Sequence, residues 1–217
     1  MFRQVLYVQW KWARLELIVC AIAAFLIPPV VMNVFIGQYD TYYTRGLLTG
    51  SAATGVFYVA LALVVAVTLA ARPWNADAAL NHAYALSLPV SWSEFTRYRF
   101  LAGAVLLVVP ALTVWLSGIV TAGSITIPPT LQAYPASLAI RFLLMALVLY
   151  SAVFALQYVA GKRAAKLGAW VLVLLLVVEV VVQLFHLGDP FVPTWKLLTS
   201  WPGPFRLLTA RWMLIDV

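Results

Sequence analysis

Apolar residues fall into five long runs that are separated by short polar stretches. Each run approaches the roughly 20 residues that a helix needs to cross the hydrocarbon layer of a membrane. In lipid, backbone N–H and C=O groups must be paired within their own segment, so each run is predicted to be helical. The predicted fold class is therefore all-α, a polytopic transmembrane helix bundle formed as one domain over residues 1–217. The five expected spans cover about Leu15–Ile36, Leu47–Ala71, Phe100–Ala122, Leu138–Ala160 and Leu167–Leu187.

The composition supports this pattern. The chain is 65% hydrophobic and 10% charged, with a mean hydropathy of +0.98. Soluble domains are usually about 45–50% apolar and about 25% charged, so a soluble globule is excluded. The net charge of +7 raises the question of nucleic acid. The basic residues stand singly at the ends of apolar runs, however, which favours membrane anchoring and no nucleic-acid partner.

The distribution of lysine and arginine predicts the orientation. If the N-terminus is cytoplasmic, the inner flanks hold nine basic residues and the outer flanks of the first four spans hold two. This asymmetry predicts a multi-pass protein of the cell membrane with a cytoplasmic N-terminus. The inner residues are Arg3, Lys11, Arg14, Arg72, Arg97, Arg99, Lys162, Arg163 and Lys166, and the outer ones are Arg45 and Arg141.

The first 14 residues mix apolar, aromatic and basic side chains. Such a segment is typical of a helix that lies along the cytoplasmic surface with its tryptophans at headgroup level. The alternative is a first span that simply begins earlier. Further along, Pro28-Pro29 and Pro110 are expected to kink the first and third spans. Kinks of this kind require neighbouring helices or water to satisfy the freed carbonyls, which favours a packed bundle.

The longest cytoplasmic connection is expected over residues 72–99. A short helix is predicted at about Ala76–Leu86 with Asn75 available as its cap, and Pro89 ends this stretch. Ser91 or Ser93 can then cap a new helix that leads into the third span. This cytoplasmic loop is suited to docking a soluble partner. The alternative is an ordinary amphipathic linker.

Two other segments carry polar groups of interest. Glu179, Gln183 and His186 share one face of the fifth span, so they could line a translocation path, relay protons or form an interhelical hydrogen bond. The segment 188–217 is too rich in proline and charge to span and is expected outside the cell.

Gly46 and Gly50 give the second span a start of small residues, which favours close packing, within the chain or between two copies.

Signs of enzyme chemistry are sparse. The single cysteine, Cys20, allows no intrachain disulfide, and the two histidines, His82 and His186, are expected on opposite sides of the membrane. No phosphate-loop pattern, metal-ligand spacing or catalytic triad can be assembled. We therefore expect no cofactor, no metal site and no enzyme.

The stretch His82–Phe100, HAYALSLPVSWSEFTRYRF, resembles the cytoplasmic loop of exporter-type ATP-binding-cassette permeases. That family has an "LSLPVSRSE" stretch here, and Trp92 stands where a basic residue is usual. The resemblance implies six spans, a dimer of like or unlike permease chains, and a separate ATPase that receives the loop helix. Only five spans are predicted here, so a sixth is either missing from this sequence or absent in this member. The residues implied to dock the ATPase are Ala76, Asp77, Leu80, His82, Leu86, Leu88, Pro89, Ser91 and Glu94.

The function predicted on this basis is that of a permease subunit, which moves a substrate by using ATP hydrolysis on a partner chain. Its expected partners are the ATPase, a second permease chain and membrane lipid. Two alternatives stay open at this point: a membrane-embedded enzyme acting on lipid, and a non-transporting assembly or sensor subunit. Glu179 and Gln183 are the residues expected along a translocation path.

Overall fold

The computed structural model describes residues 1–38, 43–79, 89, 91–129, 131–158 and 213–215. Its long elements are helices, as the apolar runs predict, and the all-α fold class is confirmed. The helices are α1 (Phe2–Gln38), α2 (Tyr43–Ala79), α4 (Trp92–Leu106), α5 (Val108–Ser124) and a helix over Pro135–Tyr158, and two short strands are β1 (Leu131–Ala133) and β2 (Met213–Ile215). The chain divides into two compact units, one formed by residues 1–154 with 211–217 and the other by residues 155–210.

Four helices in the described part of the chain are long and apolar enough to cross a membrane: Phe2–Val34, Thr44–Asp77, Trp92–Ser124 and Pro135–Tyr158. They correspond to the first four expected spans. The fifth, Leu167–Leu187, lies outside the described residues. Along α1, large apolar side chains remain exposed at helical spacing, at Leu15, Ile18, Val19, Ile22, Leu26 and Val30. Water would penalise this stripe, whereas lipid would not.

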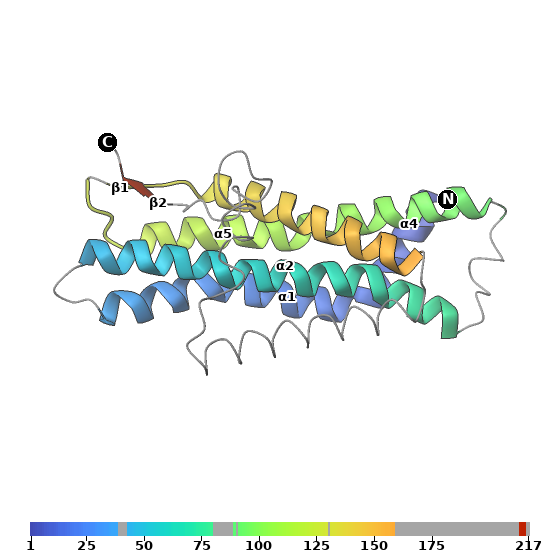
Figure 1. Cartoon of the computed structure of the whole chain (residues 1–217), viewed down its shortest axis with the longest axis horizontal. Coiled ribbons are helices and arrows are strands. Elements are labelled where there is room, and N and C mark those ends of the chain that lie inside the picture. Colours follow the sequence, from blue (N-terminus) through green and yellow to red (C-terminus); the bar gives the residue numbers. More distant parts are fainter. Residues whose placement is uncertain (39–42, 80–88, 90, 130, 159–212, 216–217) are drawn as a thin grey trace, which may run out of the picture. The chain divides into compact units, whose positions relative to one another are not determined.

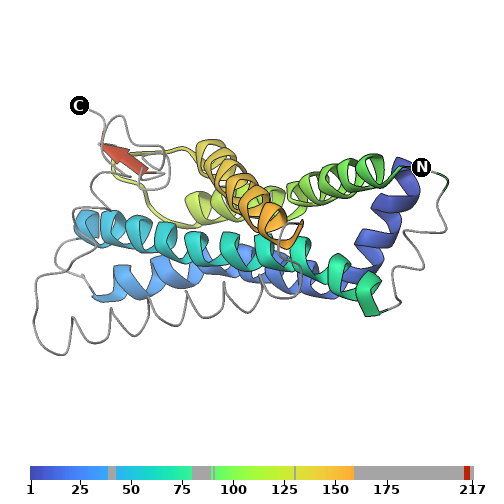
Figure 2. The ribbon, with the colours of Figure 1, turned by 45° about the vertical axis from the view of Figure 1, so that its right-hand side comes forward.

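The helices alternate in direction. Figures 1 and 2 both place the start of α1, the end of α2 and the start of α4 at one end of the described bundle. This end, here called the basic end, carries Arg3, Arg72 and Arg97. The end of α1, the start of α2 and the end of α5 lie at the opposite end. Two of the three basic flanks predicted to share one side of the membrane therefore lie at one end of the fold, and the third, with Lys162, Arg163 and Lys166, lies outside the described residues.

The helix α1 is continuous through the N-terminal segment, and Figure 2 shows its first turns at a steep angle to the rest. The segment 1–14 is thus helical and joined directly to the first span. Whether it lies on the membrane surface stays a prediction. The small-residue start of α2 is buried in this chain at Gly46, Gly50 and Ser51, so close packing here operates within the bundle.

Pro28 and Pro29 do not break α1, because other helices bond the carbonyls that these prolines leave free. A proline at position i removes the bond to the carbonyl of residue i−4. The hydroxyl of Tyr58 on α2 donates to the Ala24 carbonyl at 3.0 Å. The hydroxyl of Ser117 on α5 donates to the Phe25 carbonyl at 2.5 Å. The proline pair therefore ties α1 to both neighbours, as the expectation of a packed bundle requires.

Pro110 does interrupt its span. The third span divides into α4 and α5 at Leu107, three residues before the proline. Pro110 occupies the first turn of α5, where its missing N–H removes no intrahelical bond. The expected disturbance at Pro110 takes the form of a one-residue interruption at Leu107, whose backbone keeps helical dihedral angles, so α4 and α5 together form one span.

The two strands pair antiparallel, with Leu131 opposite Ile215 and Ala133 opposite Met213. The strand β1 lies in the connection between α5 and the helix that begins at Pro135, at the end of the bundle opposite the basic end (Figure 1). Residues 213–215 therefore share an end with a connection that was predicted to face outward.

Candidate functional site at the basic end

A buried arginine joins the end of α2 to the start of α4. Arg99 is 2% exposed and Asp77 is fully buried. The Nη1 atom of Arg99 lies 3.4 Å from Oδ2 of Asp77, and Nη2 donates to the carbonyl oxygen of Pro73. Pro73 and Asp77 are four residues apart on α2 and so lie one turn apart on one face. One planar guanidinium can therefore engage both, and these three residues are called the α2–α4 clamp.

Aromatic rings enclose the Arg99 guanidinium. Its Cζ lies 4.5 Å from the ring centre of Trp74 and 5.2 Å from that of Phe95. Trp74 in turn packs against Trp92 and Phe154, with ring centres 6.1 Å and 6.0 Å away. A buried ion pair is stable only when extra bonds compensate for the loss of water. Here the Pro73 carbonyl and the two facing rings supply that compensation.

A second polar layer lies one turn further into the bundle. Pro73 leaves the carbonyl of Leu69 without its usual donor, and Nε2 of Gln9 on α1 donates to it at 3.4 Å. The Tyr150 hydroxyl donates to the carbonyl of Phe100 at 3.2 Å. Gly103 makes room for these groups, because a Cβ at this position would overlap the Tyr150 hydroxyl. Side chains from distant parts of the chain thus meet beneath the clamp.

The start of α4 is fixed by a capping box. The Ser91 hydroxyl accepts a hydrogen bond from the Glu94 amide at 3.3 Å, and the Glu94 carboxylate accepts one from the Ser91 amide at 3.2 Å. Both bonds satisfy backbone donors that the helix itself cannot. The prediction that Ser91 or Ser93 caps this helix is confirmed for Ser91.

Together these contacts lie on both sides of the loop between α2 and α4, which was predicted to be cytoplasmic. The clamp joins residues 73–77, just before the loop, to Arg99, just after it, and the capping box sets the first turn of α4. The two helices that flank the loop are therefore joined to each other where the chain leaves α2 and enters α4. In the part of the chain that the structure describes, no three His, Cys, Asp or Glu residues gather in a way that could hold a metal ion.

Two details of the predicted loop need correction. The helix α2 runs without a break through Asn75 and Ala76 to Ala79, so no separate helix begins at Ala76. Propensity is overridden here because the clamp and the Gln9 bond support the helix beyond Pro73. Asp77, predicted to contact an ATPase, is instead buried against Arg99, so it anchors the loop from inside.

Other predicted site residues have mixed outcomes. Ser91, Glu94 and Pro89 are exposed at the basic end, where a partner could reach them, and Ala76 is half-buried. Leu80, His82, Leu86 and Leu88 lie outside the described residues, as do Glu179 and Gln183.

The sequence analysis did not identify Trp74 and Gln9 as residues of this site, and it did not predict that Arg99 is buried. Arg99 was counted only as a topological charge. Arg99 follows Phe95 by four residues, and Asp77 follows Pro73 by four, so each pair shares one helix face. That spacing could have indicated a polar contact on each helix, but the contact between Arg99 and Asp77 depends on tertiary packing.

The alternating bundle of long, lipid-compatible helices defines the class: a multi-pass membrane protein. Comparison of the chain with models of protein families, with curated proteins and with solved structures gave no match.

Proposed function

We propose that the chain is the membrane-spanning permease subunit of an ATP-binding-cassette transporter. It moves a substrate across the cell membrane, and a separate ATPase subunit hydrolyses the ATP. The proposal combines the exporter-like stretch over His82–Phe100 with the multi-pass architecture. A second permease chain completes the transporter.

The observation that carries the proposal is the α2–α4 clamp. A loop that receives force from a soluble partner must pass that force to the membrane spans. Arg99, Asp77 and Pro73 bind the two helices that flank the loop to each other. Closure of a partner against the loop would then tilt α2 and α4 as a pair. An unanchored linker would absorb the same displacement by bending.

The proposal requires the basic end to be cytoplasmic, which positively charged flanks favour. Impermeant maleimide labelling tests this in a Cys20→Ser background. Ser93→Cys at the basic end should label only after the cells are permeabilised, and Thr126→Cys at the opposite end should label in intact cells. Both positions are exposed. Labelling of Ser93→Cys in intact cells would place the loop on the wrong side for an ATPase.

Purification of the tagged full chain from its native membranes tests the partner. The expected companion is an ATPase that carries a phosphate loop, identified by peptide sequencing, and it should be lost from the double variant Leu86→Asp/Leu88→Asp. Thr126→Asp, at the opposite end, serves as the control and should keep it. Absence of such an ATPase from the wild-type chain would contradict the permease proposal, and its retention by the double variant would contradict docking through the loop.

A further inference from the structure

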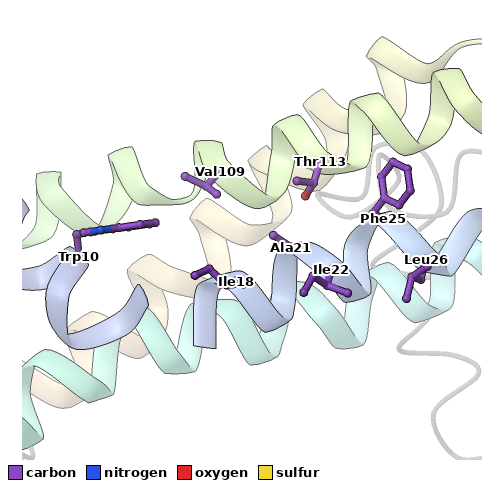
Figure 3. A pocket seen from close by; sticks show the side chains of 8 residues that line it. All are labelled: Trp10, Ile18, Ala21, Ile22, Phe25, Leu26, Val109 and Thr113. Atoms are coloured by element: carbon purple, nitrogen blue, oxygen red, sulfur yellow. The ribbon is translucent and has the colours of Figure 1, made fainter. Parts of the chain in front are cut away.

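An apolar groove runs between α1 and α5 on the outside of the described bundle. Figure 3 shows α1 along one side, with Trp10 near one end, and Val109 and Thr113 of α5 on the other. The groove is open and has a volume of about 310 Å³. The Thr113 hydroxyl and the indole N–H of Trp10 are the polar side-chain groups of this lining. The lining residues are Trp10, Ile18, Ala21, Ile22, Phe25, Leu26, Val109 and Thr113.

Two basic side chains lie on the same face of α1 as this groove. Arg14 precedes Ile18 by four residues and Lys11 precedes it by seven, so helical periodicity places all three on one side. Both basic residues are exposed. Within the described chain, neither has a hydrogen bond or an ion pair. Glu16, the nearby acid, is engaged by Arg72 at 2.5 Å. The groove therefore has a positively charged mouth at the basic end.

We propose that this groove binds an anionic phospholipid, with an acyl chain along the apolar lining and the phosphate held by Lys11 and Arg14. Measured along its bent axis, α1 covers about 24 Å from Trp10 to Leu26, at 1.5 Å per residue. One leaflet of the hydrocarbon layer is about 15 Å deep, so the groove can hold an acyl chain and reach the headgroup level. Trp10 marks that level, because tryptophan concentrates at membrane interfaces.

Charge complementarity favours lipid over a second copy of the chain. Two copies related by a two-fold axis along the membrane normal would hold Lys11 and Arg14 at the same depth as their counterparts. Like charges would then face each other across the contact. An anionic headgroup instead neutralises both residues, and basic side chains at a membrane surface select anionic over zwitterionic lipids.

Native mass spectrometry of the full chain, extracted from vesicles of phosphatidylglycerol and phosphatidylcholine in equal amounts, tests the charged mouth. The wild-type chain should retain phosphatidylglycerol preferentially. Lys11→Gln and Arg14→Gln should each weaken its retention about fivefold, as expected for one basic residue at the membrane surface. Arg97→Gln removes a charge at the same end from an exposed residue of α4 that does not line the groove, and it should leave retention unchanged. Equal loss in Arg97→Gln would reduce the effect to net charge and overturn the site.

Filling the groove tests the acyl chain independently. Ile22→Trp enlarges a lining residue, whereas Val19→Trp makes the same kind of change at an exposed position of α1 outside the lining. Retention of phosphatidylglycerol should fall in Ile22→Trp and persist in Val19→Trp. If Ile22→Trp instead abolishes a dimer while lipid retention stays at the wild-type level, the groove is an interface between copies and the lipid proposal fails.

Discussion

The guanidinium of Arg99 lies 3.4 Å from the carboxylate of Asp77, and both side chains are buried although 22 positions separate them in sequence. The pair joins α2, which precedes the loop, to α4, which follows it. Its enclosure by Trp74 and Phe95 keeps the arginine in one orientation. The pair therefore joins the two helices on either side of the loop.

Breaking this pair should destabilise the protein. Asp77→Ala leaves the Arg99 charge buried without its carboxylate, and such losses amount to about 3–5 kcal/mol in measured cases. Thermal unfolding of the detergent-solubilised chain is the measurement. The double variant Asp77→Leu/Arg99→Met should recover much of this loss, because it removes both charges. Arg97→Gln, on the exposed side of α4, should have little effect, and a loss in Arg97→Gln as large as in Asp77→Ala would rule out a specific pair.

The hydroxyl of Tyr58 should matter only while Pro28 is present. Tyr58→Phe removes the donor to the Ala24 carbonyl and is expected to cost about 0.6–2 kcal/mol, the range for hydrogen bonds between membrane helices. In a Pro28→Ala background the backbone N–H of residue 28 serves that carbonyl, so the same change should cost less. A double-mutant cycle of unfolding free energies measures this coupling. Equal costs in both backgrounds would show that Tyr58 does not serve the proline-freed carbonyl.

Gly103 should tolerate no side chain. In Gly103→Ala the new methyl group would overlap Tyr150 and approach Nε2 of Gln9 at 2.8 Å, so these groups must shift. Overpacking of this kind costs about 1–3 kcal/mol. Gly123→Ala is the matched control, because a Cβ there meets nothing within 4 Å. Comparison of the two melting temperatures is decisive, and equal values would show that the space around Gly103 adapts freely.

Loss of the Ser91 cap should loosen the start of α4. Ser91→Ala removes the acceptor for the Glu94 amide and should cost about 1 kcal/mol. Hydrogen exchange at residues 92–95 should accelerate, and Ser91→Asp should restore protection because aspartate also caps helices. Thr96→Ala, one turn later, should leave these amides protected. Failure of Ser91→Asp to restore protection would indicate that the hydroxyl acts in another way.

The sequence predicted most of what depends on local pattern. Long apolar runs have one stable form in lipid, so the first four spans and the fold class followed directly. Ser91 and Glu94 satisfy a short-range rule, and Ser91 was one of the two caps that the sequence predicted. Pro28 and Pro29 indicated that two backbone carbonyls of α1 need hydrogen-bond donors from elsewhere. The donors, Tyr58 and Ser117, lie 34 and 92 residues away from those carbonyls in sequence. Such partners are chosen by the packing of whole helices.

The site was harder to predict, for the same reason. Pro73 and Asn75 are residues that usually mark a helix boundary, yet α2 continues through them to Ala79. Gln9 bonds the carbonyl that Pro73 frees, and Arg99 bonds the next turn, so contacts from two other segments outweigh the local preference. Asp77 was consequently placed on the surface in the prediction although it belongs to the interior.

The pairing of β1 with β2 also predicts where reporters attached near the two ends of the chain would lie. The helix that begins at Pro135 runs toward the basic end, whereas Met213–Ile215 pairs with β1 at the opposite end. A reporter attached next to Phe2 and one attached next to Ile215 would accordingly sit in different compartments. A protease added to sealed vesicles of uniform orientation would remove one of them and spare the other.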